Sequence, residues 1–74
     1  APGALDSVTK ELIYIAVSIV NGCEYCIHSH TAVARKKGMT EEMRSELLAV
    51  IAMASQTNAL ANAYQIEVDD SFKQ

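Results

Sequence analysis

Turn-forming residues are scarce in this 74-residue chain, and this scarcity limits how it can fold more than any other feature. It contains one Pro and three Gly, while half of its residues are apolar. No stretch of useful length alternates apolar and polar residues as a half-buried strand does, and no internal repeat is present. We therefore predict an all-α protein, a small helical bundle with short turns. The length leaves room for one domain, so we expect residues 1–74 to form a single domain.

Helix-start and helix-stop residues divide the chain into four predicted helices. Their expected ranges are about 7–20, 23–37, 41–55 and 57–67. Asp6 or Ser7 can cap the first helix, and Thr40 can cap the third, by accepting free amide hydrogens of the first turn. Gly22 is placed to end the first helix, and Gly38 suits the left-handed position that stops the second.

The charge pattern argues against two classes of partner. The net charge is −3, whereas phosphate binding needs clustered Lys and Arg, so we expect no nucleic acid. The one basic cluster, residues 35–37, falls at the end of a predicted helix, where cations complement the helix dipole. The longest uncharged run, residues 47–66, carries too many Ser, Thr, Asn and Gln for a membrane span. No signal-peptide pattern is present, and we expect a cytoplasmic protein.

Two segments are apolar on every side: most of the first predicted helix, and residues 47–54 of the third. A helix of this kind belongs inside a larger body. One copy of a 74-residue chain has too little protein to cover both segments. We therefore predict a homo-oligomer whose interfaces bury the remaining apolar faces.

Three residues with thiol and imidazole chemistry share one face of the second predicted helix. At about 100° per residue, Cys23, Cys26 and His30 fall within about 60° of one another. Val33 and Lys37 continue the same stripe. His28 lies on a different side of the helix. The sequence therefore places a CxxC pair and one histidine together at the start of a helix.

This face has the composition of a thiol active site. The amino end of a helix favours the thiolate form of a cysteine, which is the reactive form. His30, one turn after Cys26, can accept its proton directly or through a water, and Cys23 can close a disulfide once Cys26 is oxidised. A catalytic base usually needs an orienting partner. Glu11, on a first helix expected to run antiparallel to the second, can reach His30. We therefore predict Cys26, Cys23, His30 and Glu11 as the catalytic residues.

Three other roles for these residues can be compared with thiol catalysis. A structural zinc site draws its ligands from separated segments, whereas Cys23, Cys26, His28 and His30 lie on one helix with His28 facing away. We therefore expect no bound metal, and no other cofactor. Both cysteines could simply be buried apolar residues beside a core histidine. A thioredoxin fold would need strands around the CxxC pair, and none is predicted.

The order Glu11, Cys23-x-x-Cys26 and His30 resembles the alkylhydroperoxidase D (AhpD) core, within the carboxymuconolactone decarboxylase superfamily. The surrounding residues are similar too, from Leu5 through Asn21-Gly22 to Thr40-Glu41-Glu42. The resemblance covers about residues 4–54. It rests on the joint spacing of Glu, both Cys and His, which is more specific than a CxxC pair alone.

The resemblance implies an all-α fold assembled as a homo-oligomer, commonly a trimer or hexamer. It also implies a peroxidase or disulfide reductase in which Cys26 attacks an organic hydroperoxide and becomes a sulfenic acid. Cys23 would then condense with it to a disulfide, while Glu11 and His30 relay the proton. The reductant would be a dithiol, such as a lipoyl group on a partner protein.

The sequence also departs from well-studied members of that family. Tyr25 stands between the cysteines where some members have a histidine, and the second helical half of the longer members is absent. The CxxC pair argues against the decarboxylase branch. We therefore predict a thiol-dependent alkyl hydroperoxide reductase or disulfide oxidoreductase. The alternative is a redox-responsive binding or assembly module whose CxxC pair closes without turnover.

Overall fold

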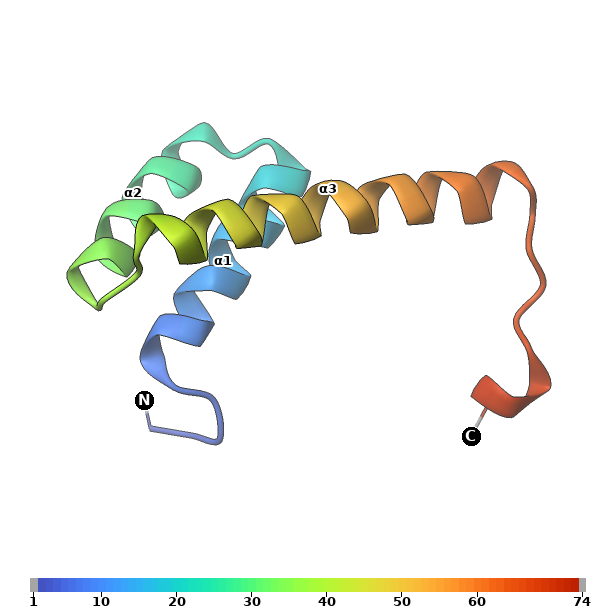
Figure 1. Cartoon of the computed structure of the whole chain (residues 1–74), viewed down its shortest axis with the longest axis horizontal. Coiled ribbons are helices and arrows are strands. Elements are labelled where there is room, and N and C mark those ends of the chain that lie inside the picture. Colours follow the sequence, from blue (N-terminus) through green and yellow to red (C-terminus); the bar gives the residue numbers. More distant parts are fainter. Residues whose placement is uncertain (1, 74) are drawn as a thin grey trace.

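The computed structural model describes residues 2–73 and shows three α-helices and no strand within that range (Figure 1). The elements are α1 (Ser7–Asn21), α2 (Glu24–Lys36), α3 (Glu41–Ala63) and a short 3-10 helix, η1 (Asp70–Phe72). The all-α prediction is confirmed. None of the helices in the described range has the length and apolar content needed to cross a membrane.

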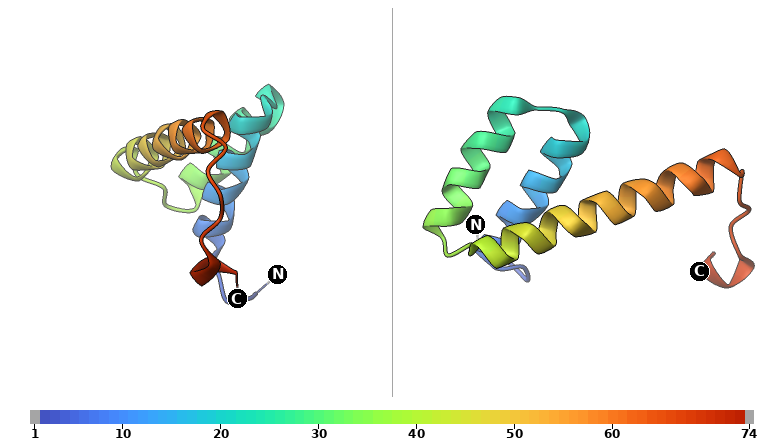
Figure 2. Two further views of the ribbon diagram at one scale, coloured as in Figure 1. Left: turned by 90° about the vertical axis from the view of Figure 1, so that its right-hand side faces the viewer. Right: turned by 45° about the horizontal axis from the view of Figure 1, so that its top comes forward.

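Helix α1 begins at the predicted residue and ends one residue later than predicted, at Asn21. The Asp6 side chain caps it by accepting a hydrogen bond from the Thr9 amide at 2.8 Å. The cap holds the pKa of Asp6 below its ordinary value, chiefly through the hydrogen bond from the Thr9 amide. Gly22 ends the helix in the left-handed conformation, with φ 71°, and its amide donates to the Ile19 carbonyl. The chain then reverses, so that α2 runs back along α1 (Figure 2).

The connection from α2 to α3 is also formed by a left-handed glycine and a capping side chain. Gly38 has φ 110°, a conformation that favours glycine, and the Met39 amide closes the turn on the Ala34 carbonyl at 2.9 Å. Thr40 then caps α3 by accepting from the Met43 amide at 3.1 Å. Both the glycine stop and the threonine start were predicted from sequence, and both are confirmed.

The core lies between α1 and α2 and is closed by the turn before α3. Its buried apolar residues are Ile15, Ala34 and Met39. Partly buried residues packed against them are Val8, Leu12, Ile19, Met43 and Leu47. Ala34 is fully buried, and its small side chain lets the two helices of the hairpin approach closely. We call residues 7–37 the α1–α2 hairpin.

The predicted break between a third and a fourth helix is wrong. Helix α3 runs without interruption from Glu41 to Ala63, through the polar segment Ser55-Gln56-Thr57. These three residues are neither Gly nor Pro, and each costs less than about 0.7 kcal/mol relative to Ala in a helix. Their exposed side chains also need no partner. The last predicted helix was expected to reach residue 67, but α3 ends at Ala63. The chain then turns at Gln65, which has φ 51°.

The distal half of α3, residues 52–63, extends away from the hairpin (Figure 1). Every described residue from 52 onward is exposed, and the C-terminal segment with η1 lies beyond the end of the helix. Large apolar side chains in this region include Met53, Leu60, Tyr64, Ile66 and Phe72. A single copy of the chain therefore leaves these apolar side chains uncovered.

Candidate functional site

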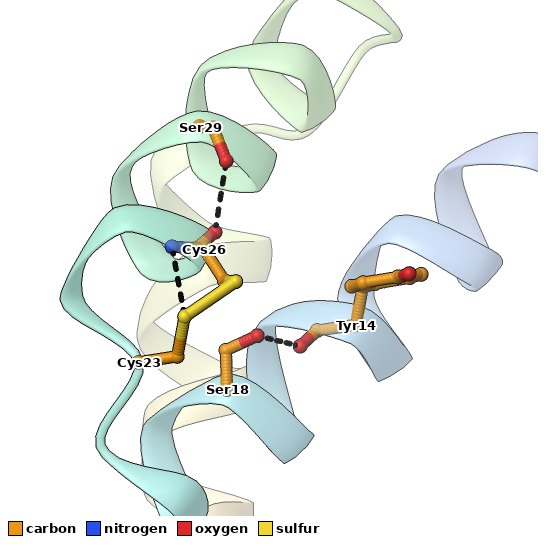
Figure 3. The surroundings of a disulfide bond; sticks show 5 residues. All are labelled: Tyr14, Ser18, Cys23, Cys26 and Ser29. Carbon is orange, nitrogen blue, oxygen red and sulfur yellow. Dashed lines mark hydrogen bonds between the residues drawn. A yellow bond between two sulfur atoms is a disulfide. The ribbon is translucent and has the colours of Figure 1, made fainter.

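The two cysteines form a disulfide at the start of α2 (Figure 3). Their Cα atoms are 5.3 Å apart, and the Cys26 amide donates a hydrogen bond to the Cys23 sulfur at 3.3 Å. Cys23 has an extended backbone and acts as the N-cap, so α2 begins one residue later than predicted. The sulfur takes the place that a Ser or Asp side chain usually fills at this position. Cys23 therefore sits where an anion would be favoured.

Helix α1 holds the backbone of the first cysteine in place. The Cys23 amide donates to the Ser18 carbonyl at 2.9 Å, which fixes the backbone of the first cysteine to the end of α1. The buried Ser18 hydroxyl in turn donates to the Tyr14 carbonyl at 2.7 Å (Figure 3). This serine has no free hydroxyl donor left, because its hydrogen is used within its own helix. Figure 3 shows its side chain beside the disulfide.

Glu11 and His30 meet across the hairpin. Oε1 of Glu11 lies 2.7 Å from Nδ1 of His30, and the two side chains are 13% and 28% exposed. The sequence predicted that antiparallel helices would bring these two residues within reach, and the structure places them in contact.

The charge state of Glu11 decides how the imidazole is oriented. The hydrogen bond from His30, and then that from Lys37, hold the pKa of Glu11 below its ordinary value. An ionised carboxylate only accepts hydrogen bonds, so Nδ1 of His30 must carry the hydrogen. In the neutral ring, Nε2 then has the free lone pair. Glu11 therefore selects the tautomer in which Nε2 can act as a base.

Two further side chains contact this pair, and sequence reasoning assigned neither to the site. The ring of Tyr14 stacks on the ring of His30, with centroids 3.9 Å apart and planes inclined by 16°. Lys37 Nζ lies 3.1 Å from Oε2 of Glu11. Lys37 does continue the stripe of Cys23, Cys26 and His30, which was the signal available in the sequence. The stacking partner on the opposite helix had no comparable signal.

The basic cluster at the end of α2 divides between different contacts. Arg35 pairs with Glu41 across the turn at 3.5 Å, and both side chains are exposed. Lys37 pairs with Glu11. The helix-dipole explanation of this cluster is therefore incomplete, because one of its members belongs to the carboxylate–imidazole pair.

His28 lies apart from this arrangement, as predicted. It lines an open surface hollow with Glu24, Tyr25 and Ser29 on the outer side of α2. Among residues 2–73, no group of three or more His, Cys, Asp or Glu side chains is arranged to hold a metal ion. Cys26 lies one helical turn before His30 and is bonded to Cys23. This arrangement can support thiol chemistry assisted by an imidazole.

The model of the carboxymuconolactone decarboxylase family matches residues 1–67. The chain belongs to this family. Among curated relatives, the alkyl hydroperoxide reductase AhpD of Solibacter usitatus is 42% identical over 64 residues, which are 86% of this chain and 34% of that protein. A protein described as uncharacterized protein 4 in the cox locus of Paracoccus denitrificans is 43% identical over 63 residues, 85% of this chain and 57% of its own length.

A solved structure agrees with the family assignment. The crystal structure of the alkylhydroperoxidase AhpD core from Rhodospirillum rubrum matches with a TM-score of 0.96 and 57% identity, over 100% of this chain and 54% of that one. The predicted AhpD-like fold within the carboxymuconolactone decarboxylase family is therefore confirmed. The chain spans about a third of the AhpD protein of Solibacter usitatus and about half of the solved chain.

Proposed function

We propose that this member of the carboxymuconolactone decarboxylase family is a thiol-dependent alkyl hydroperoxide reductase. One observation carries the proposal: the Cys23–Cys26 disulfide begins the helix that also presents His30 to Glu11. Relatives that bear the name alkyl hydroperoxide reductase support it. We also propose that residues 1–74 act as one domain, which the family match over residues 1–67 supports.

In the proposed reaction, the Cys26 thiolate attacks the terminal oxygen of an organic hydroperoxide. The O–O bond breaks, Cys26 becomes a sulfenic acid, and the departing alkoxide takes a proton that His30 had accepted from the Cys26 thiol. The Cys23 thiol then attacks the Cys26 sulfur and releases water, which leaves the disulfide. One hydroperoxide and two thiols thus give one alcohol, one water and one disulfide.

A dithiol would complete the cycle. One of its thiolates attacks the Cys23–Cys26 disulfide, and its second thiol resolves the mixed disulfide, so the dithiol leaves oxidised and both cysteines leave reduced. A lipoyl group on a partner protein fits this chemistry, because its two thiols close readily on each other. The N-cap position of Cys23 favours its departure as a thiolate in the first step.

Turnover of tert-butyl hydroperoxide with dihydrolipoamide tests the proposal directly. We expect the wild type to consume both, Cys26→Ser to fall to the uncatalysed rate, and Ser45→Ala, an exposed change in α3, to keep full activity. In Cys23→Ser, the sulfenic acid at Cys26 should persist and be captured by dimedone, as seen by mass spectrometry. A wild type that closes its disulfide once but does not turn over would support a redox-responsive module instead.

We further propose that the chain forms a homo-oligomer, either a trimer or a hexamer. The exposed apolar side chains of the distal half of α3 support this. So does an apolar groove of about 350 Å³ that α1 and α3 line together, with Val17, Val20 and Ile51 among its walls. Light scattering during size-exclusion chromatography measures the assembly. A single species with the 8.0 kDa mass of one chain would contradict the proposal.

A further inference from the structure

Glu11 is held from two sides by side chains of the neighbouring segment. His30 contacts one carboxylate oxygen at 2.7 Å, and Lys37 Nζ contacts the other at 3.1 Å. The Glu11 side chain is 13% exposed and Lys37 is 37% exposed, so water reaches the cation more easily than the carboxylate. Each oxygen of the carboxylate therefore has its own donor.

The backbone around Lys37 is fixed by the end of α2. The Lys37 amide donates to the Val33 and Ala34 carbonyls, and the Met39 amide donates back to Ala34 at 2.9 Å across Gly38. Met39 is buried in the core, so this turn is anchored on both sides. The Lys37 backbone is thus held in a defined position at the end of α2.

We propose that Lys37 is a positioning residue for the Glu11–His30 pair, because it binds one carboxylate oxygen and leaves the other to orient the imidazole. A carboxylate with one donor can rotate about its last bond and still keep that hydrogen bond. A second donor on the opposite oxygen fixes the plane of the carboxylate, and so the direction in which it receives Nδ1. The kinetic part of this inference rests on the proposed function, and the structural part does not.

The second consequence concerns the charge of Glu11. Lys37 helps to hold the pKa of Glu11 below its ordinary value, through its hydrogen bond and its positive charge. Lys10 and Asp6 are the other charged residues that line the open hollow beside Glu11, and they contribute charges of opposite sign there. Lys37 Nζ lies in direct contact with the carboxylate, at 3.1 Å from Oε2. Removing it should make Glu11 easier to protonate.

Lys36 offers a matched control, because it has the same charge and directly precedes Lys37 in the chain. We would compare Lys37→Met with Lys36→Met, and would use Lys37→Arg as the conservative replacement and Lys37→Gln as a second, polar substitution. The first readout is the pH titration of the Glu11 carboxyl carbon by NMR in the disulfide form, which needs no turnover. We expect its midpoint to move to higher pH in Lys37→Met and Lys37→Gln, and to stay in place in Lys36→Met.

The second readout is the pH profile of hydroperoxide turnover. We expect Lys37→Met to lower kcat by about two- to fivefold, because partly exposed ion pairs are individually weak, and to move the acidic limb toward neutral pH. KM should not change, since Lys37 is assigned no contact with the substrate. Lys37→Arg should recover most of the wild-type kcat and most of the wild-type position of the acidic limb.

Two results would overturn the inference. One is a Glu11 titration that moves equally in Lys36→Met and Lys37→Met, which would reduce the effect to net charge. The other is a Glu11 titration that does not move in either Lys37→Met or Lys37→Gln. A wild type without peroxidase turnover would instead defeat the proposed function, and the NMR titration would still decide the role of Lys37.

Discussion

The α1–α2 hairpin and the distal half of α3 differ in how much of their apolar surface is buried. The hairpin buries Ile15 and Ala34, and its two helices are joined by the Glu11–His30 contact. The distal half of α3 has no buried residue, although it carries Met53 and Leu60. Both regions are apolar and helical, yet only the hairpin buries side chains within one copy of the chain.

The difference shows that helix formation and burial are separate requirements. The distal half of α3 is helical because Ala and other strong helix formers dominate it, and because it continues from a capped first turn. The hairpin is held by packing and by polar contacts between helices. The candidate site lies in the region that buries its own side chains, whereas the distal half of α3 leaves apolar side chains exposed.

The largest expected effect separates the two regions by stability. Ile15→Ala should lower the free energy of unfolding by about 2–5 kcal/mol, because it removes a buried side chain and leaves a cavity. Leu60→Ala, at a side chain that is 50% exposed, should change it by less than about 0.5 kcal/mol in the dilute chain. Urea unfolding at several protein concentrations measures both. If the two variants lost the same free energy of unfolding at every protein concentration, the distal half would be packed within one copy.

A helix break in the distal half tests whether the hairpin depends on it. Gln56→Pro should cost the helix about 3 kcal/mol locally, because proline removes an amide hydrogen and clashes with the preceding turn. We expect circular dichroism to lose helical signal, while NMR signals of Tyr14 and His30 keep their positions. Gln56→Ala is the control and should keep the full helical signal. If the Tyr14 and His30 signals moved in Gln56→Pro alone, the two regions would be coupled.

A smaller effect compares a cap with a mid-helix position. Thr40→Ala should destabilise the protein by about 1 kcal/mol, because the Met43 amide loses the acceptor that starts α3 beside the hairpin. Thr57→Ala, in the exposed distal half, should be neutral or slightly stabilising, since Ala is the better helix former. Thermal unfolding of the two variants measures the difference. Equal losses in both would mean that the cap contributes nothing specific.

The smallest expected effect is the dependence of stability on acid. The pKa of Glu11 is lowered in the folded chain, first by His30 and then by Lys37. Its contribution is therefore fully present above the ordinary carboxyl range and is lost as the pH falls through the lowered value. Glu11→Gln should make the fall of melting temperature on acidification shallower, and Glu67→Gln, in the exposed tail, should leave it unchanged. A slope that is identical in Glu11→Gln would contradict the assignment.

The local rules predicted the helix ends near Gly22, Gly38 and Thr40, because each depends on neighbours within four residues. They failed at residues 55–57, where polar side chains suggested a break. An exposed helix tolerates such residues, and whether it is exposed is decided by the rest of the fold. Cys23 was placed one residue too far into its helix, since its sulfur serves as the cap.

The sequence by itself determined where α1 and α3 begin, and which thiol and imidazole residues share a face of α2. Spacing along one helix is a local property, so the positions of Cys23, Cys26 and His30 followed from it. Only the tertiary structure brought Lys37 to the far oxygen of Glu11 and Tyr14 to the face of His30. Those contacts depend on how closely two helices pack, which the buried Ala34 and the two glycine turns set together.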